Sequence, residues 1–480
     1  MKLIVEPFRL ILQGASERLQ KFLRSKLAIY DDYCKWPKIL WTAILERTNG
    51  DLILPRFIPR KFIFGDGLQV ERVDNTEYEE DVIRINMDAS PKNDLQRDAL
   101  EYLFDDLNRF RANVRVLDLP TGAGKTFLAL CAVSRLGVKA CIFVHKITMI
   151  ETPWIKDILK FTNIKREEIC IIQGSDSVKR AYKHKDKYKI FICVHKTFET
   201  IAMKADGEEV IRSMYKDLGI GLNIIDEAHR ELLDVFYINM FSPCKRALYL
   251  TATLGRVDYK ENEIFRYIVP VTDTFRSNVY IADNKIITYC PRPFTTTVDE
   301  AWTKRFHNIV GIRLSTYCDY IMANSNVQEY IYNGIKNAID EILKANPDGQ
   351  ITILLGTLEL IQWVYDGLTI DYPDIEIGNF TSIIPAKKRV DELKKKIILS
   401  TEKSMDSATD SSVDNLIMTV PVTNDIQLTQ IIGRIRDKEN HPAPYFVYDV
   451  FDTSLPKMLK NFNTRKKIIT ERLAKEVRKA

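Results

Sequence analysis

The segment VRVLDLPTGAGKT, residues 114–126, joins an apolar run to a loop of small residues that ends in lysine and threonine. Val114–Leu119 has the composition of a buried strand, and Phe127–Leu136 has the composition of a helix. A glycine-rich loop between a strand and a helix is the setting of a phosphate-binding loop, although Leu119 stands where the strict pattern has its first glycine. We therefore predict a strand–loop–helix unit of an α/β domain that binds the phosphates of a nucleotide.

This loop offers the groups that hold a nucleoside triphosphate. Its small residues are Thr121, Gly122, Ala123 and Gly124. Small side chains let backbone N–H groups close around the phosphates, and the start of the following helix adds positive potential. Lys125 brings a positive charge, and the hydroxyl of Thr126 is a ligand for Mg²⁺. The alternative, a chance GxGKT in a turn, does not account for the strand before the loop and the helix after it.

A second motif, Asp226-Glu227-Ala228-His229, directly follows the apolar run Leu222–Ile225. The end of a strand in a parallel sheet is where ligands bind. Asp226 is suited to the Mg²⁺ shell, and Glu227 is suited to orient and deprotonate an attacking water. An acidic helix cap is the alternative for these four residues. Their position after a strand, about a hundred residues beyond Lys125, favours the catalytic interpretation.

Two series of apolar runs, with helix-like stretches between them, follow along the chain. The first series comprises Val114–Leu119, Lys139–Val144, Glu168–Ile172, Lys189–Val194, Leu222–Ile225 and Ala247–Leu250. The second begins with an amphipathic helix at Val327–Ala345 and continues with Gln350–Leu355, Lys396–Ser400, Asn415–Val420 and Tyr445–Val450. Strands that alternate with helices form a parallel sheet covered on both faces. The sequence therefore predicts the α/β class, with two tandem parallel-sheet domains.

The chain is expected to divide into five parts. They are an N-terminal substrate-recognition domain (1–80), an ATP-binding domain (81–256), a less regular connecting segment (257–320), a second α/β domain (321–455) and a basic C-terminal helix (456–480). Glu71–Asp81 is acidic and linker-like, so the cores that begin after Asp94 are expected to be self-sufficient.

Positive charge is concentrated at the two ends of the sequence. Residues 1–70 hold twelve Lys or Arg against seven Asp or Glu, and residues 457–480 hold nine against two. Clustered basic residues suit contacts with a phosphate backbone. Solubilising surfaces are the alternative, and charge alone does not separate the two.

Composition narrows the class of protein. Hydrophobic residues make up 45% and charged residues 28% of 480 residues, the balance of a soluble globular protein with more than one domain. No run approaches the roughly eighteen apolar residues of a membrane span, so no membrane partner is expected. The eight cysteines form no CxxC pair, which argues against zinc and disulfides and for a reducing cytoplasm.

Four motifs occur in the order seen in superfamily 2 helicases. They are PTGAGKT, DEAH, Thr251-Ala252-Thr253 after an apolar run, and Gln430–Arg436, QIIGRIR. Over residues 94–437 the sequence resembles the RecG/XPB-like branch, and within it the phage recombination and repair helicases of the UvsW type. The resemblance implies two RecA-like domains, ATP and Mg²⁺ as cofactors, and DNA as the partner.

The resemblance also implies roles for individual residues. Gln96 resembles the glutamine that reads adenine, and His229, Thr251 and Thr253 look like couplers between the ATP site and nucleic acid. Gln430 and Arg434 match the last motif, in which an arginine finger neutralises the charge that develops in phosphoryl transfer. The usual GRxxR spacing is one residue shorter here, so Arg434 rather than Arg436 is expected to be the finger. The family's TGxD segment corresponds to Ser407-Ala408-Thr409-Asp410, which makes Asp410 a candidate ribose or Mg²⁺-side contact.

Nucleic-acid contacts are predicted at strand ends in both domains. Residues that resemble backbone-holding loops are Lys146, Lys196, Thr197, Thr357 and Thr401. For the adjacent His145 and His195 the alternative is a polar side chain that simply meets solvent. In the N-terminal part, Tyr30, Tyr33, Trp36 and Trp41 stand beside Lys35 and Lys38. These aromatics suit base stacking or, alternatively, the core of a small domain.

The sequence thus predicts an ATP-dependent DNA helicase or translocase that acts on single-stranded, branched or forked DNA in recombination, repair or replication. An RNA helicase is one alternative, because motor motifs contact the backbone and do not settle the sugar. An ATP-gated clamp that remodels nucleic acid without unwinding it is another. A small-molecule kinase leaves the second α/β series and Gln430–Arg436 unexplained.

We predict that Arg434→Ala lowers ATP turnover far more than ATP affinity, because an arginine finger acts on charge that develops in the transition state. Arg436→Ala should have a milder effect. Steady-state ATPase rates and nucleotide titrations of both variants test this ranking, and the reverse order would assign the finger to Arg436.

Overall fold

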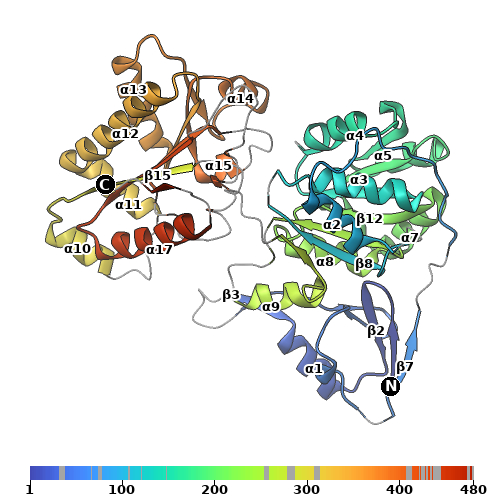
Figure 1. The fold of residues 1–480 in the computed structure, drawn as a ribbon. Helices are drawn as coiled ribbons and strands as arrows, with labels where there is room; N and C mark the ends of the chain where they lie inside the picture. The colour runs from blue at the N-terminus through green and yellow to red at the C-terminus, as the bar shows by residue number, and fades with distance from the viewer. Residues whose placement is uncertain are drawn as a thin grey trace. The chain divides into compact units, whose positions relative to one another are not determined.

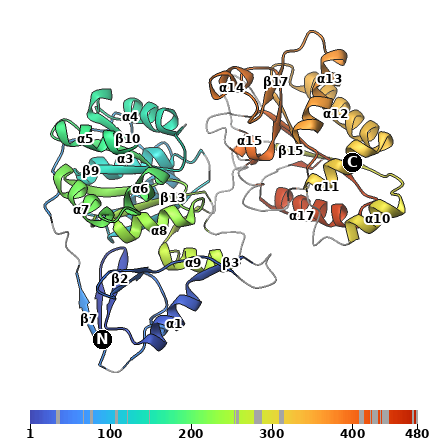
Figure 2. The ribbon, with the colours of Figure 1, turned by 180° about the vertical axis from the view of Figure 1, so that it is seen from behind.

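The chain forms two compact units, Met1–Ser277 and Asn278–Ala480, which are described separately. The computed structural model is shown in Figure 1 and, from behind, in Figure 2. It describes residues 1–31, 38–65, 67–73, 78–105, 109–120, 122–147, 149–252, 254, 259–277, 287–307, 314–406, 413–420, 422, 428, 431–432, 435, 445–472 and 476–477. No helix in these ranges is both long and apolar enough to cross a membrane.

The first unit is built around a seven-stranded parallel sheet in the order β10-β11-β9-β12-β13-β8-β14. Its strands are β8 (Val114–Asp118), β9 (Lys139–Val144), β10 (Ile169–Ile172), β11 (Ile190–Val194), β12 (Ile220–Ile225), β13 (Ala247–Thr251) and β14 (Phe275–Arg276). The six predicted strands are recovered, with ends shifted by at most two residues. Buried residues fill almost every position of β8 to β13, because helices cover both faces.

Successive residues of these strands point to opposite faces of the sheet, and each face has its own core. Val116 and Phe143 belong to one core, whereas Leu117 and Ile142 belong to the other. The second of these cores contains α2 (Asp94–Leu103), α3 (Lys125–Leu136) and α4 (Lys156–Phe161). The first contains α5 (Ser175–Lys183), α6 (His195–Ala202), α7 (Gly207–Leu218), α8 (Leu232–Phe241) and α9 (Tyr259–Ile268).

The second unit repeats the topology of the first. Its parallel sheet has the order β17-β18-β16-β19-β20-β15-β21. The strands are β15 (Ile287–Phe294), β16 (Ile351–Leu355), β17 (Ile377–Phe380), β18 (Ile397–Thr401), β19 (Asn415–Met418), β20 (Tyr445–Asp452) and β21 (Glu476–Val477). Counted from the first strand of each sheet, both orders read 3-4-2-5-6-1-7. The prediction of two tandem parallel-sheet domains is confirmed, although the sequence shows no internal repeat.

The described helices of the second unit range in length from 5 to 21 residues. They are α10 (Glu300–His307), α11 (Leu314–Ala323), α12 (Ser325–Ala345), α13 (Leu358–Asp371), α14 (Ala386–Glu392), α15 (Glu402–Asp406) and α17 (Pro456–Arg472). The basic C-terminal helix predicted from the sequence is α17. It ends at Arg472, and the short strand β21 follows it at the edge of the sheet.

Strand β15 lies in the segment that the sequence suggested was a connector. It pairs along its whole length with β20 and is an inner strand of the second sheet. Pro291 and Pro293 argue against a strand when the sequence is considered alone, because proline cannot donate to a strand ladder. The two prolines are two residues apart and so face the same side, and β21 pairs only with Thr288 and Tyr289. The strand is therefore compatible with both prolines.

The N-terminal part forms a five-stranded sheet in the order β5-β6-β2-β1-β7. Its elements are β1 (Lys2–Val5), β2 (Arg9–Gln13), α1 (Glu17–Lys26), β5 (Leu45–Glu46), β6 (Leu52–Pro55) and β7 (Gln69–Arg72), with a separate hairpin of β3 (Ala28–Asp31) and β4 (Lys38–Thr42). β7 is an exposed edge strand, parallel to β1, whose last two residues fall in the stretch Glu71–Asp81 that the sequence suggested was a linker. Because every residue of β7 is exposed, its composition resembles that of a linker.

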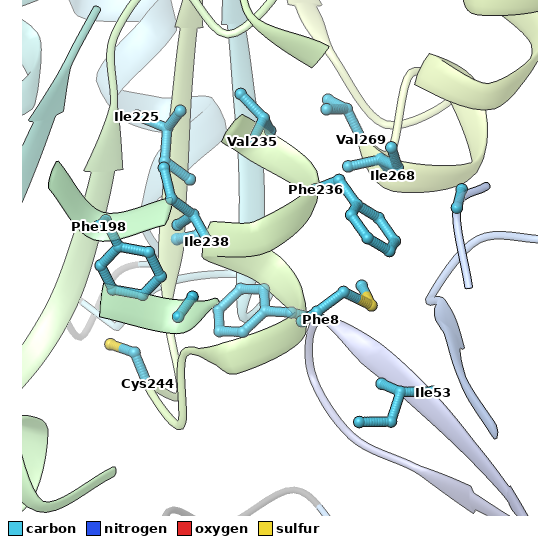
Figure 3. Packing of buried hydrophobic residues seen from close by; sticks show 14 of the residues in the cluster. Phe8, Ile53, Phe198, Ile225, Val235, Phe236, Ile238, Cys244, Ile268 and Val269 are labelled. Atoms are coloured by element: carbon cyan, nitrogen blue, oxygen red, sulfur yellow. The ribbon is translucent and has the colours of Figure 1, made fainter. Parts of the chain in front are cut away.

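This small sheet shares a hydrophobic core with the first parallel sheet. Figure 3 shows Phe8 and Ile53 beside Phe236 and neighbouring residues of α8, and all belong to one buried cluster. Arg9 is only 2% exposed, and its guanidinium donates to the backbone carbonyl of Met240. The expectation that the cores after Asp94 are self-sufficient does not match this packing, since the N-terminal residues complete one of those cores.

The structure describes two of the four N-terminal aromatic residues named above, Tyr30 and Trp41. Trp41 packs against Phe236 with ring centroids 5.7 Å apart, which is the core role. Tyr30 is half-buried on β3. Tyr33, Lys35 and Trp36 lie outside the described residues.

We predict that Phe8→Ala loosens α8 as well as the N-terminal sheet, because it leaves a cavity in the shared core. Loss of a buried phenyl group costs about 3–5 kcal/mol. Hydrogen–deuterium exchange should rise in Leu232–Phe241, while Val70→Ala, on the exposed face of β7, should change nothing there. Faster exchange confined to β1 and β2 would show that the two sheets are independent.

Candidate nucleotide-binding site

The loop between β8 and α3 carries the predicted phosphate-binding residues. Gly122 and Gly124 have φ angles of 86° and 90°, in the left-handed region that favours glycine. Gly124 directly precedes the first helical residue, Lys125. The ammonium group of Lys125 donates to the carbonyl oxygen of Leu119 at 2.9 Å, and Thr126 lies half-buried in the first turn. The described part of the loop thus has the backbone shape of a phosphate cradle.

Gln96 fastens α2 to this loop. Its side-chain amide nitrogen donates to the carbonyl oxygen of Ala123 at 3.0 Å, and its oxygen accepts from the backbone N–H of Lys92 at 2.9 Å. A Cβ atom on Gly124 would overlap the Gln96 amide nitrogen. The predicted adenine-reading glutamine is therefore a direct neighbour of the loop, and its amide group would have to move aside for any larger residue at position 124.

Asp226 follows β12 and is held by three hydrogen bonds. Its backbone N–H donates to the carbonyl of Phe143 at 3.0 Å. Its carboxylate accepts from the indole N–H of Trp154 and from the backbone N–H of Glu227, both at 2.9 Å. Burial and, to a smaller extent, the charge of Glu227 together raise the pKa of Asp226 to about 6, against the opposing effects of Trp154 and Lys125. A nearby cation would therefore favour its ionised form.

Glu227 has the geometry of a base held among positive groups. It has a φ of 50°, the one positive value among the described non-glycine residues. Its carboxylate oxygen Oε2 lies 3.5 Å from His229 Nδ1 and 3.7 Å from Arg230 Nε. Burial alone would raise the pKa of Glu227, but His229, Lys125 and Arg230 outweigh it, and the net shift is downward. Glu227 is thus an ionised acceptor, the state that a general base requires.

His229 links the acidic loop to β13. Its Nδ1 lies 2.8 Å from the hydroxyl of Thr251, and both side chains are buried. The backbone N–H of Ala228 donates to the carbonyl of Leu250, and that of Leu119 donates to the carbonyl of Thr251. The end of β13 therefore contacts both the acidic loop and the start of the phosphate loop. Coupling through His229 and Thr251 has a physical path here and stays a prediction.

The histidines after β9 and β11 differ in burial, since His145 is half-buried and His195 is fully buried. His195 is completely buried at the start of α6, and burial lowers its pKa to about 4. Burial, assisted by Arg230, lowers the pKa of His145 to about 3. The solvent-facing alternative is wrong for His195, because α6 begins at that residue and turns its side chain into the core. Both rings are neutral near pH 7.

Structural partners account for Lys196, Thr357 and Thr401 among the predicted nucleic-acid contacts. Lys196 pairs with the buried carboxylate of Glu199, and Lys146 and Thr197 are half-buried. Thr357 caps α13 by accepting from the backbone N–H of Leu360, and Thr401 accepts from that of Ser404. These contacts explain the three residue types without a ligand, and nucleic-acid contact stays a prediction for all five residues. Other predicted site residues lie outside the described ranges: Thr121, Thr253, Asp410, Gln430, Arg434 and Arg436.

Sequence reasoning missed two residues that shape the site. Trp154 is fully buried and orients Asp226, and it is the single tryptophan of residues 81–256, which was its one available signal. Arg230 directly follows the DEAH motif and faces Glu227. Its position next to the motif was visible, but its partner was not.

The side chains present suit Mg²⁺. This ion prefers a few oxygen ligands and keeps several waters, with further ligands from phosphate oxygens. The hydroxyl of Thr126 and the buried carboxylate of Asp226 are ligands of this kind. In the described ranges no three His, Cys, Asp or Glu side chains gather into a metal cluster. A site completed by a nucleotide needs no such cluster.

Comparisons with known proteins concern mainly this part of the chain. Residues 90–256 match the family described as Type III restriction enzyme, res subunit. Similar proteins include the "DNA 3'-5' helicase XPB" of Mycobacterium tuberculosis, 29% identical over 155 residues, or 32% of this chain. The "Putative DNA 3'-5' helicase Rad25" of Halobacterium salinarum is 27% identical over 176 residues, or 36% of this chain. These matches support a superfamily 2 helicase domain at residues 90–256.

The similarity is partial. The chain spans about a quarter of the length of these relatives, 26% of each. Among solved structures, the helicase domain of Pyrococcus furiosus Hef aligns with 77% of this chain and 97% of its own, with a TM-score of 0.47 and 12% identity.

We predict that Gly124→Ala weakens nucleotide binding more than Gly122→Ala. Both changes force a side chain into a left-handed conformation, which costs about 1–2 kcal/mol. A Cβ atom at Gly122 meets no atom within 4 Å, whereas one at Gly124 collides with Gln96. Titration with a fluorescent ATP analogue should show affinity at least about tenfold lower for Gly124→Ala than for Gly122→Ala.

The collision can be tested separately from the backbone strain. Adding Gln96→Ala to Gly124→Ala should restore part of the lost affinity, because it removes the colliding amide. Circular dichroism checks the fold of each variant. Equal affinities of the two glycine variants would contradict the assigned contact.

Proposed function

We propose that this chain is an ATP-dependent DNA helicase or translocase of the UvsW type, acting on branched or forked DNA in recombination, repair or replication. The observation that carries the proposal is the arrangement at one edge of the first sheet. There the loop with Lys125, the pair Asp226 and Glu227, and the bridge from His229 to Thr251 follow neighbouring strands. The names of the relatives, which are DNA helicases, support the same reading.

The residues of the first unit divide the work of ATP hydrolysis. The backbone around Gly122 and Gly124 encloses the phosphates, and Lys125 turns from the Leu119 carbonyl toward them. Thr126 and Asp226 would hold Mg²⁺, and the bound ion would supply positive charge that offsets the charge of the phosphates. Glu227 orients the attacking water and takes its proton. The roles of Gln430, Arg434 and Asp410 rest on the resemblance to the helicase family alone.

Coupling to DNA is assigned to the bridge between His229 and Thr251. Any displacement at the end of β13 reaches both the acidic loop and the phosphate loop, since β13 contacts both. The loops with Lys146, Lys196 and Thr197, and in the second unit Thr357 and Thr401, supply backbone contacts that do not read sequence. The small N-terminal sheet selects the shape of the substrate.

The direction of movement is part of the proposal. Both curated relatives are named as DNA 3'-5' helicases, and we extend that direction to this chain. Partial duplexes with a tail at either the 3' or the 5' end test it. Displacement should require the 3' tail.

ATPase assays with single-stranded DNA, forked DNA, a four-way junction and RNA, run side by side with strand-displacement assays, test the function. The proposal expects stimulation by DNA and displacement of forked or branched substrates. Stronger stimulation by RNA would indicate an RNA helicase. ATP-dependent retention of DNA without displacement would indicate a clamp.

We predict that Glu227→Gln binds ATP normally but hydrolyses it about 10²–10⁴-fold more slowly, because the amide fills the same space without accepting a proton. Nucleotide titration together with single-turnover hydrolysis measures both quantities. Loss of ATP binding along with turnover would make Glu227 a structural residue instead. The variant also serves as the inactive control in the displacement assays.

A further inference from the structure

Helix α17 is anchored to the second sheet by a buried ion pair. Arg465 donates to both carboxylate oxygens of Asp449 on β20, at 3.0 Å and 2.9 Å, and both side chains are only 1% exposed. The hydroxyl of Tyr289 on β15 donates to the same carboxylate at 2.8 Å. A pair with two parallel hydrogen bonds fixes the rotation of the helix as well as its position.

Apolar residues complete the inner face of α17. Met458, Phe462 and Ile469 are buried, and the ring of Phe462 stacks on Phe451 of β20. Together with Arg465 they repeat every three or four residues, which places them on one side of the helix. The opposite side is therefore held outward in a fixed orientation.

The outer face of α17 is basic and polar. A shallow, open depression along it is lined by Pro456, Leu459, Lys460, Asn463, Thr464 and Lys467. From Pro456 to Thr470 the sequence contains no acidic residue. Among the side chains that the structure describes, which do not include that of Glu471, no carboxylate lies within ion-pair distance of Lys460 or Lys467. No side chain in the described part of the chain thus compensates the positive charge on this face.

The spacing of these lysines matches a nucleic-acid backbone. Lys460 and Lys467 are seven residues apart, so they lie on the same side of the helix about 10 Å apart along its axis. That span corresponds to roughly three base steps along one strand of duplex DNA. Asn463 and Thr464, between them, offer neutral polar groups of the kind that contact phosphate and sugar.

The position of α17 in the fold connects this face to the ligand-binding edge of the second sheet. All strands of the sheet are parallel, so their carboxyl ends share one edge. Thr357 and Thr401 lie at that edge, and β20 reaches it at Asp452, four residues before Pro456. The first turns of α17 therefore start at the edge where ligands of such sheets bind.

We propose that the outer face of α17 binds the phosphate backbone of duplex DNA, as a second contact that continues from the strand-end loops of the same unit. The proposal depends on the proposed function for the identity of its ligand. A shallow surface with separated cations suits a regular polyanion. An acidic protein segment would need a deeper apolar pocket to anchor it, and the six residues that line this depression do not form one.

The test compares two double variants of the full chain. Lys460→Gln/Lys467→Gln removes two charges from the outer face of α17. Lys344→Gln/Lys388→Gln removes two exposed charges elsewhere in the same unit and is the matched control. Glutamine is a good helix former, so neither change should disturb a helix. Thermal unfolding and ATP turnover without DNA verify that each variant is intact.

Binding to a short blunt DNA duplex is measured without nucleotide over a salt series from about 50 to 200 mM. Each lost phosphate contact should lower the slope of log K against log salt by about 0.9, so the α17 variant should lose about 1.8. Its affinity at low salt should fall about 10- to 100-fold, while the control keeps the wild-type slope.

Identical slopes for the α17 variant and its control would overturn the proposal, and so would a wild-type chain that binds no duplex. The two proposals fail in different ways. A reduced slope in a protein whose ATPase ignores DNA would reject the helicase and keep the DNA contact of α17. An unchanged slope in a protein whose ATPase responds to DNA would do the opposite.

Discussion

Parallel pairing of β12, β13 and β8, in that spatial order, is the constraint from which the candidate site follows. Parallel strands end at the same edge, so Asp226, Thr251 and the phosphate loop come together although they are far apart in sequence. Hydrogen bonds then fix the distances between them: Ala228 bonds to Leu250, and Leu119 bonds to Thr251. Any change of register in β13 would displace both loops at once.

Most of this sheet could be predicted, because its strands are continuous apolar runs bounded by turns. Several strands escaped prediction, among them β14, β17 and β21, and two others lack that signal for physical reasons. β15 contains two prolines, and β7 has four exposed residues whose composition does not differ from that of a linker. The residues of the two loops were found from their motifs, but the contacts that give them their chemistry were not. Nothing in the sequence pairs Trp154 with Asp226, because proximity across a fold leaves no local pattern.

The two sheets use one topology for unequal purposes. The strand that occupies the place of β8 in the second sheet is β15, and the five residues after it, Thr295–Asp299, include neither glycine nor lysine. Instead the hydroxyl of Thr296 donates to the buried carboxylate of Asp452 at 2.7 Å. The same hydroxyl lies 2.9 Å from the hydroxyl of Ser454. The end of β15 is thus filled by side chains at the ends of β15 and β20 that bond to one another. Phosphate-binding chemistry of the kind seen after β8 therefore has no counterpart at this strand.

The shared core between the N-terminal sheet and α8 has a mechanical consequence. α8 begins at Leu232, five residues after Glu227. Its Phe236 belongs to the same buried cluster as Phe8, and the backbone carbonyl of its Met240 accepts a hydrogen bond from Arg9. A load applied to the N-terminal sheet passes into α8 without crossing a flexible joint, because close-packed interiors transmit strain. A displacement of the N-terminal sheet should therefore reach the start of α8, five residues from Glu227, the carboxylate that we propose activates water.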